Sequence, residues 1–364
     1  RLDAAQALGP VAATCVGNTS IDVRVPETTT PGAFPVRLTG TAHDGRKQHS
    51  FGWIVVPEPL EVLGIGPMVL DHRPGARLSV RNSSTLPEIL HVTVRLQGGI
   101  REMPDVRVPG NSDTNISIPL HELGDVDPTQ QVPLRLELRG THMADTVLQR
   151  RLCFLSAARR HQEPAEGAFP NRAAWSGTGS SGRIDKANAQ FEWDDRALYI
   201  DLRVEDDVFH QTQTDGTTWR EDSVQLAFDT HPECDALYEP LASVFTKKVT
   251  QLSIARTSAG IQVWRDKTHN EGELPTGRAE ASVEAQVERD EAEQITTYRV
   301  AIPWPQIGLD RPRPGQPLGI AVLVNDSDGP DTPRCGLELF SGIMNDKSHT
   351  LYGSLLLENG PAEP

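Results

Sequence analysis

Residues Trp219–Asp229 read Trp-Arg-Glu-Asp-Ser-Val-Gln-Leu-Ala-Phe-Asp, and this stretch decides how the surrounding chain is interpreted. Apolar side chains alternate along it with small or polar ones: Val224, Leu226 and Phe228 against Ser223, Gln225 and Ala227. This two-residue period predicts a strand with one buried face and one solvent-facing face. A tryptophan, two acids and an amide stand near the beginning of the strand.

The start of this strand allows two interpretations. A broad aromatic ring beside short polar groups is suited to holding a sugar, because the ring contacts CH groups while polar groups bond hydroxyls. The alternative is an ordinary sandwich strand whose tryptophan packs at the edge of the core.

Similar strands follow one another through the C-terminal half of the chain. Between residues 165 and 359 we count about nine strand-like runs with turns between them and little helical periodicity. Ala197–Val204 is one of these runs, and its apolar residues again fall on one face. Short helical turns are expected near Glu239–Phe245 and Trp304–Gly308. The pattern predicts an all-β fold with a two-sheet sandwich of jelly-roll type.

The N-terminal half predicts immunoglobulin-like β-sandwiches. Residues 59–157 contain about seven short strand-like runs, the number that such a domain requires. Residues 1–58 contain too few strands for a closed sandwich, and Phe34–Leu38 is echoed by Val132–Leu136 about one domain length later. We therefore expect four segments: 1–58, the C-terminal part of an immunoglobulin-like unit; 59–157, a whole unit; 158–164, a linker; and 165–364, the C-terminal sandwich.

Composition limits the partners. The formal net charge of the 364 residues is −15, and an acidic surface repels phosphate backbones, so we expect no nucleic acid partner. No run of about 18 apolar residues is present, so we expect no membrane span. The first residue is Arg1 rather than Met, which we interpret as a mature or excised piece of a longer product.

Motifs for catalysis or zinc are missing from the sequence. None of the four cysteines has Cys-x-x-Cys spacing. Cys234 and Cys335 fall in the same predicted domain and either pair or remain separate thiols, which we favour. The sequence contains no nucleophile elbow, phosphate loop or HExxH motif, so we name no catalytic residue. Acids are numerous enough for a glycosidase, but sequence does not give the separation of two carboxylates.

An ordered set of motifs resembles carbohydrate-binding module family 9 and the related DOMON-like sandwiches. In chain order the motifs are Phe191–Asp195 with Leu198–Ile200 and Val204–Asp207, Trp219–Leu226, Tyr298–Trp304, Leu318–Ile320 with Val324–Asp326, and Tyr352–Leu355. Together they extend over nearly all of residues 165–359. The resemblance implies a non-catalytic sugar-binding sandwich. Residues 59–157 resemble the immunoglobulin-like spacers of secreted bacterial glycosidases.

The resemblance also implies a sugar site. Members that bind sugar hold a terminal ring between two tryptophans, with an acid, an amide and an arginine around its hydroxyls. Carried over by position, the site would comprise one ring, two acid or amide positions in the opening stretch and two polar residues of a later loop: Trp219, Glu221, Gln225, Asn345 and Lys347.

Three departures from the family pattern surround that one ring. Gln225 stands where the family usually has Glu, Ser253 stands near the position of the arginine, and no second tryptophan occurs between Phe340 and Gly353. Two other tryptophans near polar loops, Trp175 and Trp264, are candidates for a replacement ring. Three aromatic residues in apolar runs are expected in the core: Trp193, Trp304 and Phe340.

Two groups of acidic residues are candidates for a structural Ca²⁺ site. Asn325–Asp331 is the densest group of oxygen ligands, and Asp206, Asp207 and Asp215 form a second group. Carboxylate oxygens around a glycine turn suit Ca²⁺, and the family resemblance also implies structural Ca²⁺. The expected ligands are Asp206, Asp207, Asp326 and Asp328. The alternative is an Asx-rich turn that holds no metal.

These observations lead to one expected function and two alternatives. We expect a carbohydrate-binding accessory region of a secreted or cell-surface multidomain protein, which holds other domains of the same polypeptide, such as a glycoside hydrolase, near a glycan or polysaccharide. The first alternative is a structural or assembly module of an extracellular protein without sugar binding. The second is a glycan-active enzyme.

Overall fold

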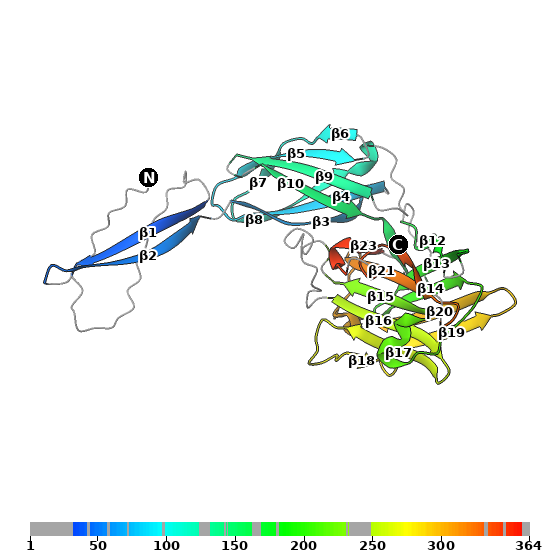
Figure 1. The fold of residues 1–364 in the computed structure, drawn as a ribbon. Coiled ribbons are helices and arrows are strands. Elements are labelled where there is room, and N and C mark those ends of the chain that lie inside the picture. The colour runs from blue at the N-terminus through cyan, green and yellow to red at the C-terminus, as the bar shows by residue number, and fades with distance from the viewer. Residues whose placement is uncertain are drawn as a thin grey trace.

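The computed structural model describes residues 32–41, 44–56, 59–70, 73–96, 99–123, 132–141, 143, 145–161, 169–179, 182–230, 232, 249–330, 334–344 and 347–358. Strands dominate this part of the chain, so the predicted all-β class is confirmed. The chain forms a hairpin, a first sandwich and a second sandwich in that order (Figure 1). No helix in the described part combines the length and apolar character needed to cross a bilayer.

The hairpin consists of β1 (Gly32–Thr41) and β2 (Lys47–Val56). The two strands pair antiparallel from Gly32 opposite Val56 to Thr41 opposite Lys47, and together they make a two-stranded sheet. This hairpin is the described part of the predicted partial unit 1–58, whose immunoglobulin-like character stays a prediction.

The first sandwich packs two antiparallel sheets around one core. One sheet has the order β3-β4-β8 and the other β10-β9-β5-β6, with β7 paired to β5. Its elements are β3 (Leu60–Leu70), β4 (Arg73–Asn82), β5 (Glu88–Leu96), β6 (Gly99–Glu102), β7 (Val106–Val108), β8 (Ser112–Pro119), the 3₁₀ turn η1 (Leu120–Glu122), β9 (Val132–Gly140) and β10 (Thr146–Leu152). Alternate apolar residues of β5, such as Val92 and Val94, point into this core.

The second sandwich contains the remaining elements. They are β11 (Leu155–Arg159), β12 (Arg172–Thr178), β13 (Ile184–Trp193), β14 (Ala197–Glu205), η2 (Asp215–Arg220), β15 (Ser223–Asp229), β16 (Val249–Thr257), β17 (Gly260–Lys267), β18 (Gly277–Arg278), β19 (Glu284–Asp290), β20 (Ile295–Pro303), η3 (Trp304–Ile307), β21 (Pro317–Asp326), β22 (Cys335–Leu339), η4 (His349–Leu351) and β23 (Gly353–Leu357). The helical turn expected at Trp304–Gly308 is confirmed as η3, whereas the one near Glu239–Phe245 lies outside the described residues.

Two sheets of the second sandwich face each other across its core. The β15 sheet has the order β18-β17-β16-β15-β21-β23, with β22 on β21, and the β14 sheet has the order β13-β14-β20-β19, with β12 on β13. The core between them includes a T-shaped pair of indoles, Trp193 and Trp304, whose centroids lie 6.2 Å apart. The prediction that these two residues are core is confirmed.

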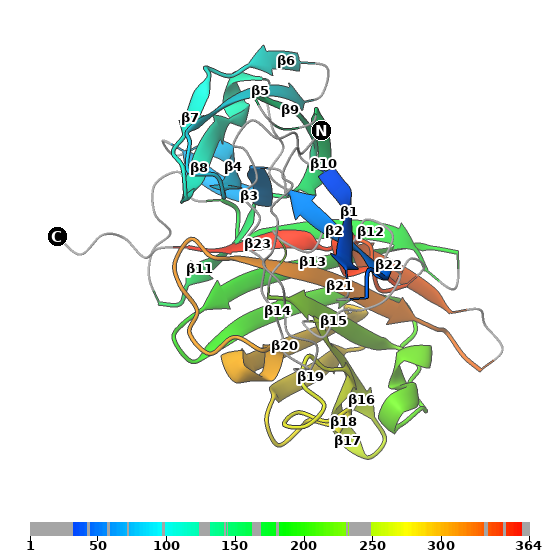
Figure 2. The same cartoon turned by 90° about the vertical axis from the view of Figure 1, so that its left-hand side faces the viewer.

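The strand β11 joins the two sheets at a corner. Leu155–Ala157 pairs in parallel with β23, and Ala158 and Arg159 pair in parallel with β13. Residues 158 and 159, which we predicted in the linker, are therefore the end of a strand. Phe154 and Leu356 belong to the first sandwich's core, and β23 lies directly against that sandwich (Figure 2). The first sandwich thus connects to the second through packed apolar residues.

The opening strand is shorter and more buried than its alternation predicts. Trp219 lies in η2, and β15 begins only at Ser223. All seven residues of β15 are buried, so the prediction of a solvent-facing side was wrong. Distant residues cover that side: Ala227 packs with Ile343 and Tyr352 in a small apolar cluster on the outward face of the β15 sheet.

Candidate functional site

Six aspartates converge at one end of the second sandwich. They come from the start of β13, the loop after β14, the residue before β15, the end of β21 and the turn after β21: Asp185, Asp206, Asp207, Asp222, Asp326 and Asp328. Antiparallel neighbours place the start of one strand beside the end of the next, and face-to-face packing brings the two sheet ends together. Ligand oxygens of Asp206, Asp222 and Asp326 lie within 4.8 Å of one another, as do those of Asp206, Asp207 and Asp328.

The carboxylates of this aspartate cluster are buried and repel one another. Asp206, Asp222 and Asp326 are only 7%, 3% and 3% exposed. Burial, reinforced by the charge of Asp206, raises the pKa of Asp222 to about 9. Burial and the charges of Asp326 and Asp185 raise the pKa of Asp206 to about 7. Negative charge in this position is therefore unfavourable unless a proton or a cation neutralises it.

The geometry of the aspartate cluster fits one hard cation. A cavity of about 10 Å³ is lined by Asp185, Asp206, Asp222 and Asp326. That volume is about the room one small bound species needs, and Ca²⁺ takes six to eight oxygen ligands at about 2.3–2.6 Å. Gly179 permits the approach of Asp185, because a Cβ there would overlap the Asp185 carboxylate.

The structure brings all four predicted metal ligands together and adds two more. Asp206, Asp207, Asp326 and Asp328 belong to the aspartate cluster, whereas Asp215 lies apart and pairs with Arg278 at 2.6 Å. Sequence reasoning missed Asp185 and Asp222. Asp222 stands inside the motif Trp219–Leu226, directly before a strand. This position was the signal from which Asp222 could have been predicted as a metal ligand.

Trp219, the predicted sugar platform, is half-buried at the end of η2. Its indole Nε1 donates to the Gly216 carbonyl at 3.0 Å. The guanidinium groups of Arg334 and Arg220 lie 4.9 Å and 5.5 Å from its ring centroid. Arg334 also donates to the Trp219 carbonyl at 2.9 Å, so part of the ring already has a cationic neighbour.

Trp264 in β17 is a second indole beside Gly216. A Cβ at Gly216 would lie only 3.2–3.3 Å from the Trp264 ring, so the absence of a side chain there lets η2 approach the sheet. Both indoles therefore contact one glycine. Trp175, the other candidate ring, packs against the core, and its Nε1 donates to the Leu337 carbonyl at 3.3 Å.

Glu221 supports the neighbouring loop. Its carboxylate accepts hydrogen bonds from the backbone N–H groups of Thr212 and Gln213, and from both of their side chains. Although burial acts in the opposite direction, these hydrogen bonds hold the pKa of Glu221 below its ordinary value. In its predicted sugar-binding role, Glu221 would have to use a carboxylate that already accepts hydrogen bonds from Thr212 and Gln213.

Gln225 lies in a cross-strand row on the outward face of the β15 sheet. The row runs across four strands through residues in direct register, and we call it the β15 row: Leu323, Gln225, Ser253 and Trp264. Gln225 Nε2 donates to Ser253 Oγ at 3.2 Å, and Ser253 Oγ donates to Asp266 Oδ2 at 2.5 Å. A β-bulge at Gln251 and Leu252, where β16 pairs with β17, leaves Asp266 without a register partner.

Asp266 is the acidic member of this site, and sequence reasoning missed it. Burial raises its pKa to about 6, against the hydrogen bonds from Ser253 and Gln225 and the charges of Lys267 and Lys347. The influence of Lys347 places this predicted residue near the β15 row. Asn345 lies outside the described residues.

The fold and the two sites together define a class of β-sandwich domain. It is a two-sheet β-sandwich with an aspartate cluster at one end and a polar row beside two indoles on one outward face. Residues 165–359 match the family described as carbohydrate family 9 binding domain-like. The chain therefore belongs to this family.

Two solved structures resemble parts of this chain. One is a carbohydrate binding module family 9 from Caldicellulosiruptor kristjanssonii in complex with glucose, with 16% identity, 50% of this chain and 80% of that chain covered, and a TM-score of 0.37. The other is such a module from the same organism with cellotriose, with 17% identity, 49% and 77% coverage, and a TM-score of 0.36. None of the curated proteins matches this chain.

Proposed function

We propose that this chain is a non-catalytic carbohydrate-binding region and that its sugar site lies at β17 on the outward face of the β15 sheet, around Asp266 and Trp264. Membership of the carbohydrate family 9 group supports the ligand class. The observation that carries the position is the trio Gln225, Ser253 and Asp266, which stands next to Trp264. Asp266 is the half-buried member of the trio and offers carboxylate oxygens to a sugar hydroxyl, while the buried Gln225 and Ser253 hold that carboxylate in place.

The trio is suited to this task because it is already ordered. Hydrogen bonds and strand register hold the three side chains, so a ligand would immobilise few additional groups. Trp264 supplies an indole that replaces the missing second tryptophan of the family pattern. Packing a sugar face on an indole adds about 1–2 kcal/mol, and each hydrogen bond adds about 1 kcal/mol net.

We also propose that the aspartate cluster holds a structural Ca²⁺. The proposal is supported by the separation of the carboxylates, the small cavity between them and the raised pKa values that burial produces. Asp206, Asp222 and Asp326 would be the innermost ligands. Since Asp222 lies three residues after Trp219, a cation there would hold the η2 end in place and act on the sugar site indirectly.

We propose an exported protein in which other domains of the same polypeptide, such as a glycoside hydrolase, are held near their glycan by this region. The order of the parts in Figure 1 supports this role, since a hairpin and another sandwich precede the carbohydrate family 9 domain.

A glycan array followed by titration calorimetry tests the sugar site. We expect Asp266→Asn and Trp264→Ala each to weaken the best array ligand at least tenfold, with a smaller loss for Trp219→Ala because Arg334 accompanies that ring. Arg256→Ala is the control, since Arg256 is exposed on the same strand as Ser253. Unchanged affinity in the Asp266 and Trp264 variants with intact folding would reject the site.

A structural role without sugar binding is the second candidate. The contact of Arg334 with Trp219 favours it, because a guanidinium over an indole occupies a surface that a sugar would use. This candidate predicts that no array glycan binds the wild-type chain, and that Arg334→Ala creates no binding.

A further inference from the structure

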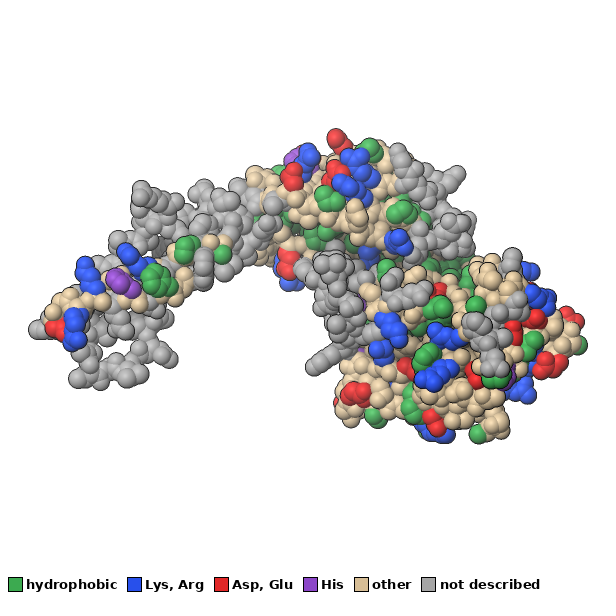
Figure 3. Space-filling view, in the orientation of Figure 1, with side chains coloured by type: hydrophobic (Ala, Val, Ile, Leu, Met, Phe, Trp, Pro, Cys, Tyr) green, Lys and Arg blue, Asp and Glu red, His purple; other side chains and the backbone are tan. Residues whose placement is uncertain are grey.

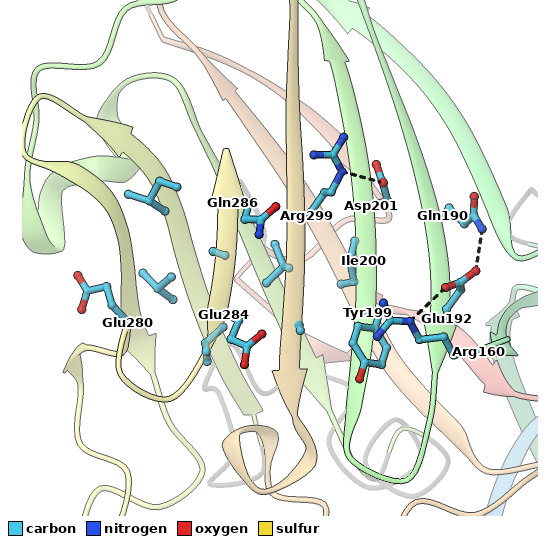
Figure 4. Close-up of a pocket in the computed structure, with 16 residues that line it drawn as sticks. Arg160, Gln190, Glu192, Tyr199, Ile200, Asp201, Glu280, Glu284, Gln286 and Arg299 are labelled. Carbon is cyan, nitrogen blue, oxygen red and sulfur yellow. Dashed lines mark hydrogen bonds and ion pairs between the residues drawn. The ribbon is translucent and has the colours of Figure 1, made fainter. Parts of the chain in front are cut away.

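A second candidate site lies on the other sheet. A groove of about 690 Å³ runs over the outward face of the β14 sheet and is bounded on one side by β17. Figure 4 shows its labelled polar side chains standing side by side on neighbouring strands. This groove shares no residue with the β15 row or with the aspartate cluster.

Two polar rows form the floor of the groove. The first β14 row crosses β13, β14, β20 and β19 through residues in direct register: Gln190, Asp201, Arg299 and Gln286. The second β14 row crosses the same strands one step along: Glu192, Tyr199, Ala301 and Glu284. Four adjacent strands span roughly 14 Å at their usual spacing, which is the length of a short oligosaccharide.

Several side chains of the two rows contact one another or neighbouring residues. Arg299 donates to Glu288 at 3.0 Å and lies 3.6 Å from Asp201. Gln190 donates to Glu192 at 3.1 Å, and Arg160 stands over the Tyr199 ring at 3.8 Å from its centroid. A binding surface on rigid strands with mutually bonded side chains loses little conformational freedom when a ligand arrives.

The chemistry of the groove suits a ligand rich in hydroxyl groups and disfavours an acidic one. Its lining carries four carboxylates, those of Glu192, Asp201, Glu280 and Glu284, and the two guanidinium groups of Arg160 and Arg299. The excess of negative charge would repel an acidic chain. Amides, carboxylates and guanidinium groups offer acceptors and donors along the whole floor. Ile261, which is 37% exposed, gives the β17 side an apolar surface for sugar CH groups.

We propose that this groove is a second glycan-binding site, which takes a neutral oligosaccharide chain laid across the two β14 rows. The proposal rests on the carbohydrate ligand class of the proposed function, but it uses a different sheet and a longer ligand. A chain bound in the groove and a sugar end bound at the β15 row would engage the same polysaccharide at two positions and strengthen retention on it.

Titration calorimetry with cellohexaose, xylohexaose and mannohexaose tests the groove. Two variants remove it: Arg299→Ala with Gln286→Ala takes away polar contacts, and Ala301→Arg fills the small central position. We expect each to weaken the best-binding hexasaccharide at least tenfold while leaving the chain folded and the affinity for the matching monosaccharide unchanged. Arg203→Ala is the matched control, because Arg203 is exposed on the same face of β14 but outside the groove.

The result separates the groove from the β15 site. Loss of hexasaccharide affinity in the groove variants, with Asp266→Asn and Trp264→Ala unaffected, supports the groove and rejects the β15 site. Loss only in Asp266→Asn and Trp264→Ala overturns the groove and supports the β15 site. A wild-type chain that binds none of the three hexasaccharides overturns the groove, and the monosaccharide titrations then decide the β15 site alone.

Discussion

The β15 row and the first β14 row are built by the same local rule and have opposite surroundings. In both, residues in direct register cross four strands on the outward face of a sheet. Gln225 and Ser253 are buried, at 6% and 1% exposure. Asp201 and Arg299 are exposed and belong to a face on which acidic and basic side chains are intermingled, as they are over much of the visible surface (Figure 3).

The difference comes from what covers each sheet. Residues of η2 and of the segment after β22 lie on the β15 sheet, where Tyr352 and Ile343 pack against Ala227 and Leu323. The β14 sheet carries no such layer among the described residues. Polar groups under cover must bond one another, since an unpaired buried group costs about 1–3 kcal/mol, whereas exposed charges tolerate loose pairing.

Matched tyrosine substitutions on the two sheets give the largest expected contrast. Tyr352 is buried in the cover of the β15 sheet, so Tyr352→Ala should destabilise the chain by about 3 kcal/mol. Tyr199→Ala on the open sheet should cost about 1 kcal/mol or less, because Tyr199 is half-exposed. Urea unfolding measures both, and equal losses would refute the distinction between covered and open sheets.

Calcium should stabilise the chain through the aspartate cluster. At a hundredfold excess over the dissociation constant, Ca²⁺ should add about 2.7 kcal/mol, which corresponds to roughly 5–10 °C in melting temperature. The comparison is between chelator-treated chain and chain with added Ca²⁺ in a thermal melt. Asp222→Asn should abolish the shift, and Asp201→Asn on the open sheet should retain it. An identical melting temperature with and without Ca²⁺ would argue against the metal.

The buried and exposed aspartates should differ in pH dependence. The folded pKa of Asp266, about 6, exceeds its ordinary value of 3.8. Between these values the folded chain holds a proton that the unfolded chain releases, so wild type loses stability as the pH rises from about 4 to about 8. Asp266→Asn removes this loss and should gain about 1 kcal/mol relative to wild type over that range.

Asp201→Asn is the control for that experiment, since Asp201 lies exposed in the first β14 row. Its stability relative to wild type should stay nearly constant over the same range. If the difference in unfolding free energy between Asp266→Asn and wild type is the same at pH 4 and pH 8, the burial of the Asp266 carboxylate is contradicted.

The smallest effect is expected from an exposed ion pair of the open sheet. Arg299→Ala removes contacts with Glu288 and Asp201, but exposed pairs contribute about 0.2–1 kcal/mol. Thermal melts at low and high salt measure the loss, which salt should reduce further. A loss above about 2 kcal/mol would show that the β14 rows serve folding more than ligand binding.

Much of the fold and part of the site could be predicted from local pattern. The alternation along Ala197–Val204 identifies strand β14 because the two faces of a strand meet different surroundings. Asp206, Asp207, Asp326 and Asp328 were predicted as metal ligands because each group is dense in the sequence. Asp185 escaped prediction, because strand pairing with β14 and the packing of the two sheets, rather than nearness in sequence, bring it to the other aspartates.

The sugar site shows where such prediction ends. Trp219 was expected on a strand but lies in η2, since a strand pattern does not locate the residue at which pairing begins. Asp266 meets Ser253 from the neighbouring strand, a pairing that the alternation of either strand alone does not reveal. Trp264 was one of two replacement candidates, and the contact with Gly216 distinguished it from Trp175.

By itself, the sequence determined the all-β class, the succession of strands along the chain and the family, because these follow from residue period and ordered motifs. Only the tertiary structure decided which outward face is covered, which aspartates meet and which indole stands beside the polar trio. The physical reason is that cover and convergence depend on contacts between residues far apart in the chain, such as Ala227 with Tyr352. A strand's own alternation specifies two faces, but it does not specify what lies against them.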